Sequence, residues 1–147
     1  MSDYLLTAKG TILPEWYDRK NHMNVVYYLS LFDQAAFKLL EGLSMDKKYI
    51  VQNDITLVAG RIYTAHKKEM FNGDNFEIHS GFVNYSETYV TLTNRMKRDG
   101  VLVASCDMRM NPIRLSDRTT TKIPQALLEQ CEKFHIKGLK DIFEDTL

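Results

Sequence analysis

The longest apolar stretch of the chain lies between residues 25 and 40, and its pattern predicts a buried helix. Apolar side chains cover much more than one stripe of that helix, which is typical of a helix buried on most sides. Asn24 is suited to cap the first turn, and Gly42 lies just past the end, where a left-handed residue is favoured. The apolar positions are Val25, Val26, Leu29, Leu31, Phe32, Ala35, Ala36, Leu39 and Leu40.

Alternating apolar and polar positions predict about five strands in the rest of the chain. The apolar positions of the second predicted strand change parity near Gly60, which indicates a bulge. Pro112 either ends the last strand or places it at an edge, because proline has no N–H to donate to a neighbouring strand. The predicted strands cover residues 4–12, 49–69, 76–84, 88–98 and 102–110.

Turn signals separate these strands. Asn72-Gly73-Asp74 and Asp99-Gly100 are typical hairpin sequences, and a further turn is expected at Asn84-Tyr85-Ser86. Pro124 is placed to open a last, amphipathic helix that ends by Gly138. We expect the tail, residues 139–147, to be loosely held and peripheral.

The order of strand, helix, four strands and helix predicts an α+β fold with one domain over residues 1–147. An antiparallel sheet of about five strands that curls around the long central helix would bury nearly all of that helix. The amphipathic C-terminal helix would pack on the surface. A sheet of this size leaves exposed edges, which favours pairing with a second copy.

Composition narrows the functional classes. The chain has 147 residues, of which 44% are hydrophobic and 26% charged, and its formal net charge is zero. Nothing therefore draws it as a whole toward nucleic acid or a membrane surface. No leader sequence or membrane-length apolar run is evident, so a cytoplasmic protein is expected. Cys106, Cys131 and the four histidines have no metal-ligand spacing, so we expect buried cysteines and no metal.

Polar residues with chemical potential precede the central helix: Asp18, His22 and Asn24. A buried helix start carries unpaired N–H groups and partial positive charge, which stabilise an oxygen atom as it becomes negative. Asp18 could supply a base or a nucleophile there. Ordinary roles are also open: Asp18 as a turn carboxylate, His22 as a satisfied polar group and Asn24, by default, as a cap alone.

The stretch that begins at Asp18 resembles the motif of hotdog-fold thioesterases related to 4-hydroxybenzoyl-CoA thioesterase. Asp18 takes the position of the catalytic carboxylate of that family, and His22, Asn24 and Tyr28 match in register. The resemblance extends over about residues 4–128.

At other positions this chain matches the sequence of the family only in part. Gly73-Asp74 matches a turn at the second strand of the family, whereas Asn21 replaces the usual glycine and Val25 replaces a second asparagine. Asparagine tolerates a left-handed backbone better than other non-glycine residues, so the turn can survive.

The resemblance implies hydrolysis of an acyl-CoA thioester, with no cofactor beyond the CoA of the substrate. Asp18 would act as general base or nucleophile, and the N–H groups of Tyr27 and Tyr28 would form the oxyanion site. His22, Asn24 and Tyr28 would position the reacting groups. Acyl-CoA is the expected partner, with neither nucleic acid nor membrane, and the expected assembly is a homodimer or a tetramer of dimers.

Aromatic side chains near Asp18 predict where the acyl group binds: Trp16, Tyr17 and Phe32. Such rings bind quaternary ammonium groups, although they are more often core residues. The sequence around the central helix resembles thioesterases of carnitine breakdown, whose substrate is betainyl-CoA. The basic candidates for the CoA phosphates, each equally explained as a solvated charge, are Arg61, Lys67, Lys68, Arg95, Lys97, Arg114 and Arg118.

Two other functions stay open within the same fold. A non-catalytic acyl-CoA-binding or regulatory protein would bind its ligand without turnover, although this chain has no spare basic segment for DNA. A hotdog enoyl-CoA hydratase also pairs Asp and His, but with an intervening proline and wider spacing than Asp18 and His22.

Overall fold

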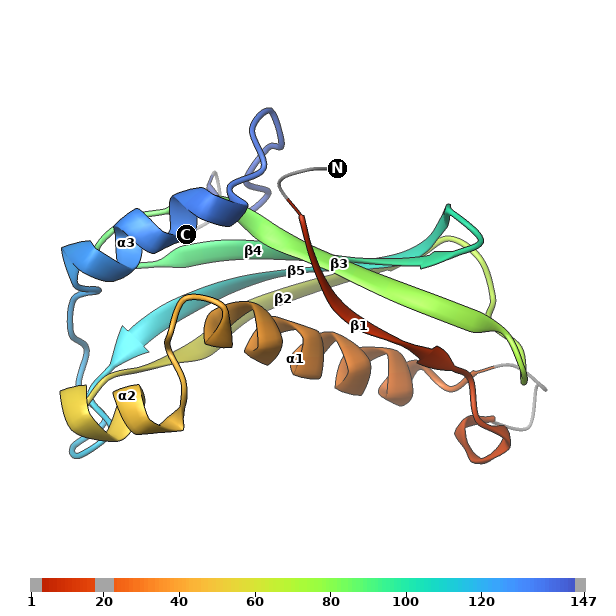
Figure 1. The fold of residues 1–147 in the computed structure, drawn as a ribbon, viewed down its shortest axis with the longest axis horizontal. Helices are drawn as coiled ribbons and strands as arrows, with labels where there is room; N and C mark the ends of the chain where they lie inside the picture. The colour runs from red at the N-terminus through yellow and green to blue at the C-terminus, as the bar shows by residue number, and fades with distance from the viewer. Residues whose placement is uncertain (1–3, 18–22, 145–147) are drawn as a thin grey trace.

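A computed structural model describes residues 4–17 and 23–144 as one antiparallel sheet laid against a long helix, α1 (Val25–Glu41). The sheet order is β1-β3-β4-β5-β2, and α1 crosses one face (Figure 1). This is the predicted α+β hotdog fold. The strands are β1 (Leu5–Thr11), β2 (Thr56–His66), β3 (Asn75–Tyr85), β4 (Val90–Arg98) and β5 (Val101–Ile113).

The core forms between one face of α1 and the concave face of the sheet. Residues of α1 at three- and four-residue spacing point inward, as an amphipathic helix requires. They meet every second residue of the strands, because strand side chains alternate between faces. Inward residues include Phe32, Ala35 and Leu39 of α1 together with Ile78, Phe82, Leu92, Met96, Cys106 and Met108 of the sheet.

The prediction that nearly all of α1 is buried is wrong for this chain by itself. Val25 and Val26 are 60% and 65% exposed, and Leu29 and Phe37 are also exposed. A single sheet covers only one side of a helix, so the apolar residues on the other side face outward. The apolar pattern of α1, which indicated burial on most sides, therefore predicts that another surface covers this outer side of the helix.

A short helix, α2 (Lys47–Asn53), occupies a segment for which a strand is predicted. The side chain of Asp46 caps it by accepting from the N–H of Tyr49 at 2.9 Å, and Asp54 ends it in a left-handed conformation. The strand prediction is thus wrong before Thr56, because these local caps outweigh the apolar pattern. The bulge predicted near Gly60 is confirmed by a register shift between Ala59 and Arg61.

The structure confirms only some of the predicted turns and helix ends. Asp99-Gly100, with φ of 51° and 78°, joins β4 and β5 as a hairpin, as predicted. Asn72-Gly73-Asp74 does form a turn, but β2 and β3 are not neighbours, so the predicted hairpin is wrong. Gly42 is right-handed, with φ of −62°, and Ser44 takes the left-handed conformation after α1 instead. Pro112 lies in β5 beyond its last pair with β4, and its carbonyl accepts from the N–H of Thr121 at 3.2 Å.

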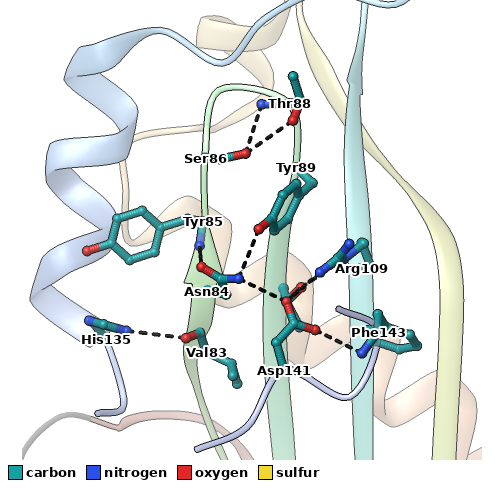
Figure 2. Close-up of polar contacts among 11 residues, drawn as sticks. Val83, Asn84, Tyr85, Ser86, Thr88, Tyr89, Arg109, His135, Asp141 and Phe143 are labelled. Atoms are coloured by element: carbon teal, nitrogen blue, oxygen red, sulfur yellow. Dashed lines mark hydrogen bonds and ion pairs between the residues drawn. The ribbon is translucent and has the colours of Figure 1, made fainter. Parts of the chain in front are cut away.

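The C-terminal segment is held more firmly than predicted. After α3 (Gln125–Cys131) and a 3₁₀ turn, η2 (Glu132–Phe134), the N–H of Ile136 donates to Phe82 O at 2.8 Å. Asp141 and Phe143 are buried, and Figure 2 shows Asp141 among residues of the sheet. The described part of the tail is fixed, because the carboxylate of Asp141 forms an ion pair with Arg109 instead of facing water.

Two compositional expectations can be compared with the described part of the chain. Cys106 and Cys131 are free and buried, as expected, and burial raises the pKa of each thiol to about 12. No helix in the described ranges is long and apolar enough to cross a membrane.

Candidate functional site

The start of α1 is held by hydrogen bonds from two neighbouring segments. Asn24 caps the helix, since its Oδ1 accepts from the N–H of Val26 at 2.9 Å. The N–H of Asn24 donates to Trp16 O in the 3₁₀ turn η1 (Pro14–Trp16) at 2.8 Å. The N–H of Met23 donates to Met70 O at 3.1 Å. The helix start is therefore fixed between η1 and the turn that precedes β3.

Tyr28 connects the first turns of α1 with the same region. Its hydroxyl oxygen accepts from the N–H of Met70 at 3.1 Å, and its ring meets that of His66 edge to face with centroids 4.8 Å apart. Burial is the main cause that raises the pKa of Tyr28 and lowers that of His66, so both stay neutral near pH 7. Sequence reasoning missed His66, because no local pattern links it to α1.

The turn before β3 is braced by an ion pair between Arg98 and Asp74. The carboxylate of Asp74 accepts from Arg98 and from the N–H of Phe71, both at 2.9 Å. Arg98 also donates to Glu69 O at 2.9 Å. Because Met70 directly precedes this turn and bonds to Met23 and Tyr28, the Gly73-Asp74 match supports the helix start indirectly.

Two of the predicted site residues, Asp18 and His22, lie outside the described residues, so their roles stay predictions. The residues that flank them are described. Tyr17 and Met23 form an isolated antiparallel bridge, which places both flanks of the motif beside the first turn of α1.

The predicted aromatic residues separate into two environments. Trp16 and Tyr27 stack with centroids 5.7 Å apart and lie, partly buried, at the helix start. Phe32 has no exposed surface and packs inside the core. Trp16 therefore lies beside the helix start, whereas Phe32 lies inside the core.

The N–H groups of the first helical turn differ in availability. Tyr27 donates to Asn24 O at 3.0 Å, and Val26 donates to the cap. None of the described residues accepts from Val25. The N–H of Val25 is therefore more available as a donor than the N–H groups of Val26 and Tyr27.

The seven basic candidates are spread over the fold. Lys67 and Lys68 directly follow His66, so they lie at the same end of the sheet as the start of α1, and both are exposed. Arg114 lies at the other end of β5, near Asp54. Metal-ligating side chains do not gather anywhere within residues 4–17 and 23–144: no group of three could hold an ion.

The curled sheet and the fixed, partly open helix start define a hotdog-fold protein. The model of the thioesterase-like superfamily matches residues 12–131, which is most of the chain. The chain belongs to that superfamily. A search of curated protein sequences gave no match.

Solved structures agree with the fold. A hypothetical protein from Staphylococcus aureus, solved in complex with CoA, has a TM-score of 0.82 at 19% identity over 90% of this chain and 85% of that chain. A probable thioesterase from Escherichia coli has a TM-score of 0.75 at 17% identity, over 90% and 100%. A 1,4-dihydroxy-2-naphthoyl-CoA thioesterase from Synechocystis has a TM-score of 0.73 at 14% identity, over 86% and 94%.

Removal of the cap should test the importance of the helix start. We expect Asn24→Ala to lower the free energy of unfolding by about 1 kcal/mol, because the N–H of Val26 loses its acceptor. Urea unfolding measures this loss. Asn24→Asp is the matched control, since aspartate caps equally well. Equal stability of the alanine variant and the native chain would contradict the role of the cap.

Proposed function

We propose that this protein hydrolyses an acyl-CoA thioester to a free acid and CoA. The observation that carries the proposal is the start of α1, where the N–H of Val25 has no acceptor among the described residues, in a chain of the thioesterase-like superfamily. Such a group, with the partial positive charge of the helix end, suits a carbonyl oxygen that becomes negative.

In the proposed reaction Asp18 takes a proton from water while the water oxygen bonds to the thioester carbon. The oxyanion accepts from Val25, with Tyr27 and Tyr28 as the donors expected from sequence. Collapse of the tetrahedral intermediate breaks the C–S bond, and the CoA thiolate takes the proton from Asp18. Alternatively, Asp18 attacks directly and water hydrolyses the mixed anhydride. Neither route changes oxidation state, so no cofactor beyond the CoA of the substrate is required.

The finer assignments extend this proposal. His22, Asn24 and Tyr28 would orient the reacting groups, while Trp16 and Tyr17 would lie beside the acyl group. Betainyl-CoA or another short-chain acyl-CoA is the proposed substrate, on the resemblance of the helix sequence to thioesterases of carnitine breakdown. Exposed Lys67 and Lys68 would meet the CoA phosphates.

A homodimer completes the proposal. Among the described residues, β2 pairs with β5 on one side and with no strand on the other, and Val58, Ile62 and Tyr63 on β2 are exposed. Apolar residues at an open strand edge favour pairing with a second copy. A twofold axis makes two β2 strands antiparallel, and it also brings further cover to the exposed side of α1.

A hydrolysis screen tests the function. Purified protein is mixed with betainyl, aromatic and fatty acyl-CoAs, and thiol release is followed with a disulfide reagent. We expect catalytic release from at least one of them. Tight acyl-CoA binding without release would instead support the regulatory alternative, and hydration of an enoyl-CoA without release would support the hydratase.

A further inference from the structure

One arginine joins the two ends of the segment that leads into β3, residues 69–74. A single nitrogen of Arg98, Nη1, donates to Glu69 O and to the carboxylate of Asp74, both at 2.9 Å. Arg98 is the last residue of β4, and its side chain and that of Asp74 are only 27% and 28% exposed. An ion pair that is partly shielded from water keeps its geometry better than a pair of fully exposed charges. Arg98 therefore holds this segment against the end of β4.

Met70 connects the held segment with the start of α1. Its carbonyl oxygen accepts from the N–H of Met23, and its N–H donates to the hydroxyl oxygen of Tyr28, both at 3.1 Å. Met70 has no exposed surface and directly follows Glu69, whose carbonyl oxygen is bound by Arg98. The position of Met70, and with it the start of α1, therefore depends on Arg98.

A second series of hydrogen bonds leads from the other end of the segment to the same place. The N–H of Gly73 donates to Ile12 O at 3.1 Å, and the N–H of Ile12 donates to Asp74 O at 2.9 Å. Ile12 lies two residues before η1, in which Trp16 O accepts from the N–H of Asn24 at 2.8 Å. The cap of α1 is thus held through the segment as well.

The two series end next to the N–H group that the proposed mechanism uses. They reach Met23 and Asn24, which directly precede Val25, the proposed oxyanion donor. Figure 1 shows the beginnings of β3 and α1 at the same end of the sheet. A misplacement of about 1 Å at a reacting group can lower the rate about 100-fold. Since the described hydrogen bonds of Arg98 reach only residues 69–74, its effect on the reaction would pass through that segment.

We propose that Arg98 is a positioning residue for thioester hydrolysis. Through residues 69–74 it holds the N–H of Val25 where that group meets the oxyanion, with Asp74 as its charged partner. The inference rests on the proposed thioesterase function. It adds to the site a residue of β4 that does not touch the substrate.

The kinetic test replaces the guanidinium group. Arg98→Met should lower kcat by about 10-fold to 100-fold and change KM much less, because the contact with the oxyanion forms only as the reaction proceeds. Arg98→Lys should recover much of the lost kcat. One nitrogen makes both contacts in the native chain, and an ammonium group also has enough hydrogens to donate to Glu69 O and to Asp74. Thiol release from the acyl-CoA found in the screen measures both constants.

Arg109→Met is the matched control for a general loss of stability. It also removes a guanidinium group from an ion pair, but that pair holds Asp141 of the C-terminal segment. We expect kcat of this variant to stay within about twofold of the native value, because distant sites act independently. All proteins are assayed at a temperature at which each is folded. An equal loss of kcat in Arg98→Met and Arg109→Met would overturn the positioning role.

Asp74→Asn provides a second variant that does not depend on the folding of Arg98→Met. The amide keeps an oxygen for the N–H of Phe71, whereas the charge that attracts Arg98 is lost. Its kcat should fall in the same direction as that of Arg98→Met, with KM again changed much less. Native kcat in a folded Asp74→Asn variant would contradict the part assigned to the ion pair.

Amide hydrogen exchange, followed by NMR, tests the structural link without catalysis. In Arg98→Met the N–H groups of Met23 and Asn24 should exchange about tenfold faster or more than in the native chain, because the helix start opens more easily. The N–H of Phe32, in the middle of α1, should exchange at the native rate. Native exchange at Met23 and Asn24 would overturn the inference. If instead the native chain hydrolyses no acyl-CoA, the proposed function is wrong whatever the exchange rates show.

Discussion

Asp18→Asn is expected to lower kcat for acyl-CoA hydrolysis by about 100-fold to 10,000-fold. An amide cannot take the proton from water, and it is a poor nucleophile toward the thioester, so both routes of the proposed mechanism are blocked. The oxyanion donor at Val25 would be unchanged, which leaves residual rate and substrate binding. Thiol release at saturating substrate measures kcat, and the substrate identified in the screen is used for both proteins.

The test requires that Asp18→Asn lowers kcat without unfolding the protein. The thermal unfolding midpoint of Asp18→Asn should stay close to that of the native chain, since the substitution keeps the size of the side chain and removes only its charge. Glu15→Gln is the matched control, because Glu15 is an exposed carboxylate in η1 with no assigned role. A folded Asp18→Asn variant with near-native turnover would remove Asp18 from the mechanism.

Asp141→Ala should produce the largest loss of stability, about 3–5 kcal/mol in the free energy of unfolding. Asp141 is 4% exposed, and its carboxylate accepts from Arg109, from Thr91 at 2.9 Å and from Asn84 at 3.1 Å (Figure 2). Its removal leaves Arg109 without its buried partner and frees the segment that carries Phe143. Urea unfolding followed by circular dichroism measures the change.

The exposed pair of Glu87 and Lys122 provides the control for Asp141. Glu87→Gln should change stability by less than about 1 kcal/mol, because exposed ion pairs contribute little. An Asp141→Ala variant as stable as Glu87→Gln would show that the C-terminal segment does not depend on the buried pair.

The pH dependence of stability gives an independent check on Asp141. Burial by itself would raise the pKa of this carboxyl, but hydrogen bonds from the N–H of Phe143, from Arg109, from Thr91 and from Asn84 together lower it. A lowered pKa in the folded state stabilises the fold above the ordinary value of about 4 and loses that contribution as the pH falls further. The difference between the native chain and Asp141→Ala should therefore shrink in acid.

Elements defined by neighbouring residues were predictable from sequence. The α1 helix follows from an apolar pattern bounded by Asn24, and Asp99-Gly100 forms a hairpin because both residues adopt left-handed conformations. The α2 helix was missed, because capping by Asp46 competes with the apolar residues of the same segment. The pairing of β2 with β5 also escaped prediction, since turn residues specify local reversal and not the neighbour of a strand.

The candidate site shows the same division. The motif from Asp18 to Tyr28 is continuous, so sequence resemblance could locate it and associate it with thioester chemistry. Met70 and His66 reach the helix start from distant parts of the chain, and no local pattern places them there.

The central helix with its cap and the number of strands could be predicted from the chain alone, because they depend on residue spacing and on short-range hydrogen bonds. The order of the strands, the availability of the N–H of Val25 and the burial of Asp141 follow instead from the tertiary structure. These features depend on contacts between residues far apart in the chain, whose geometry is fixed when the sheet closes over α1.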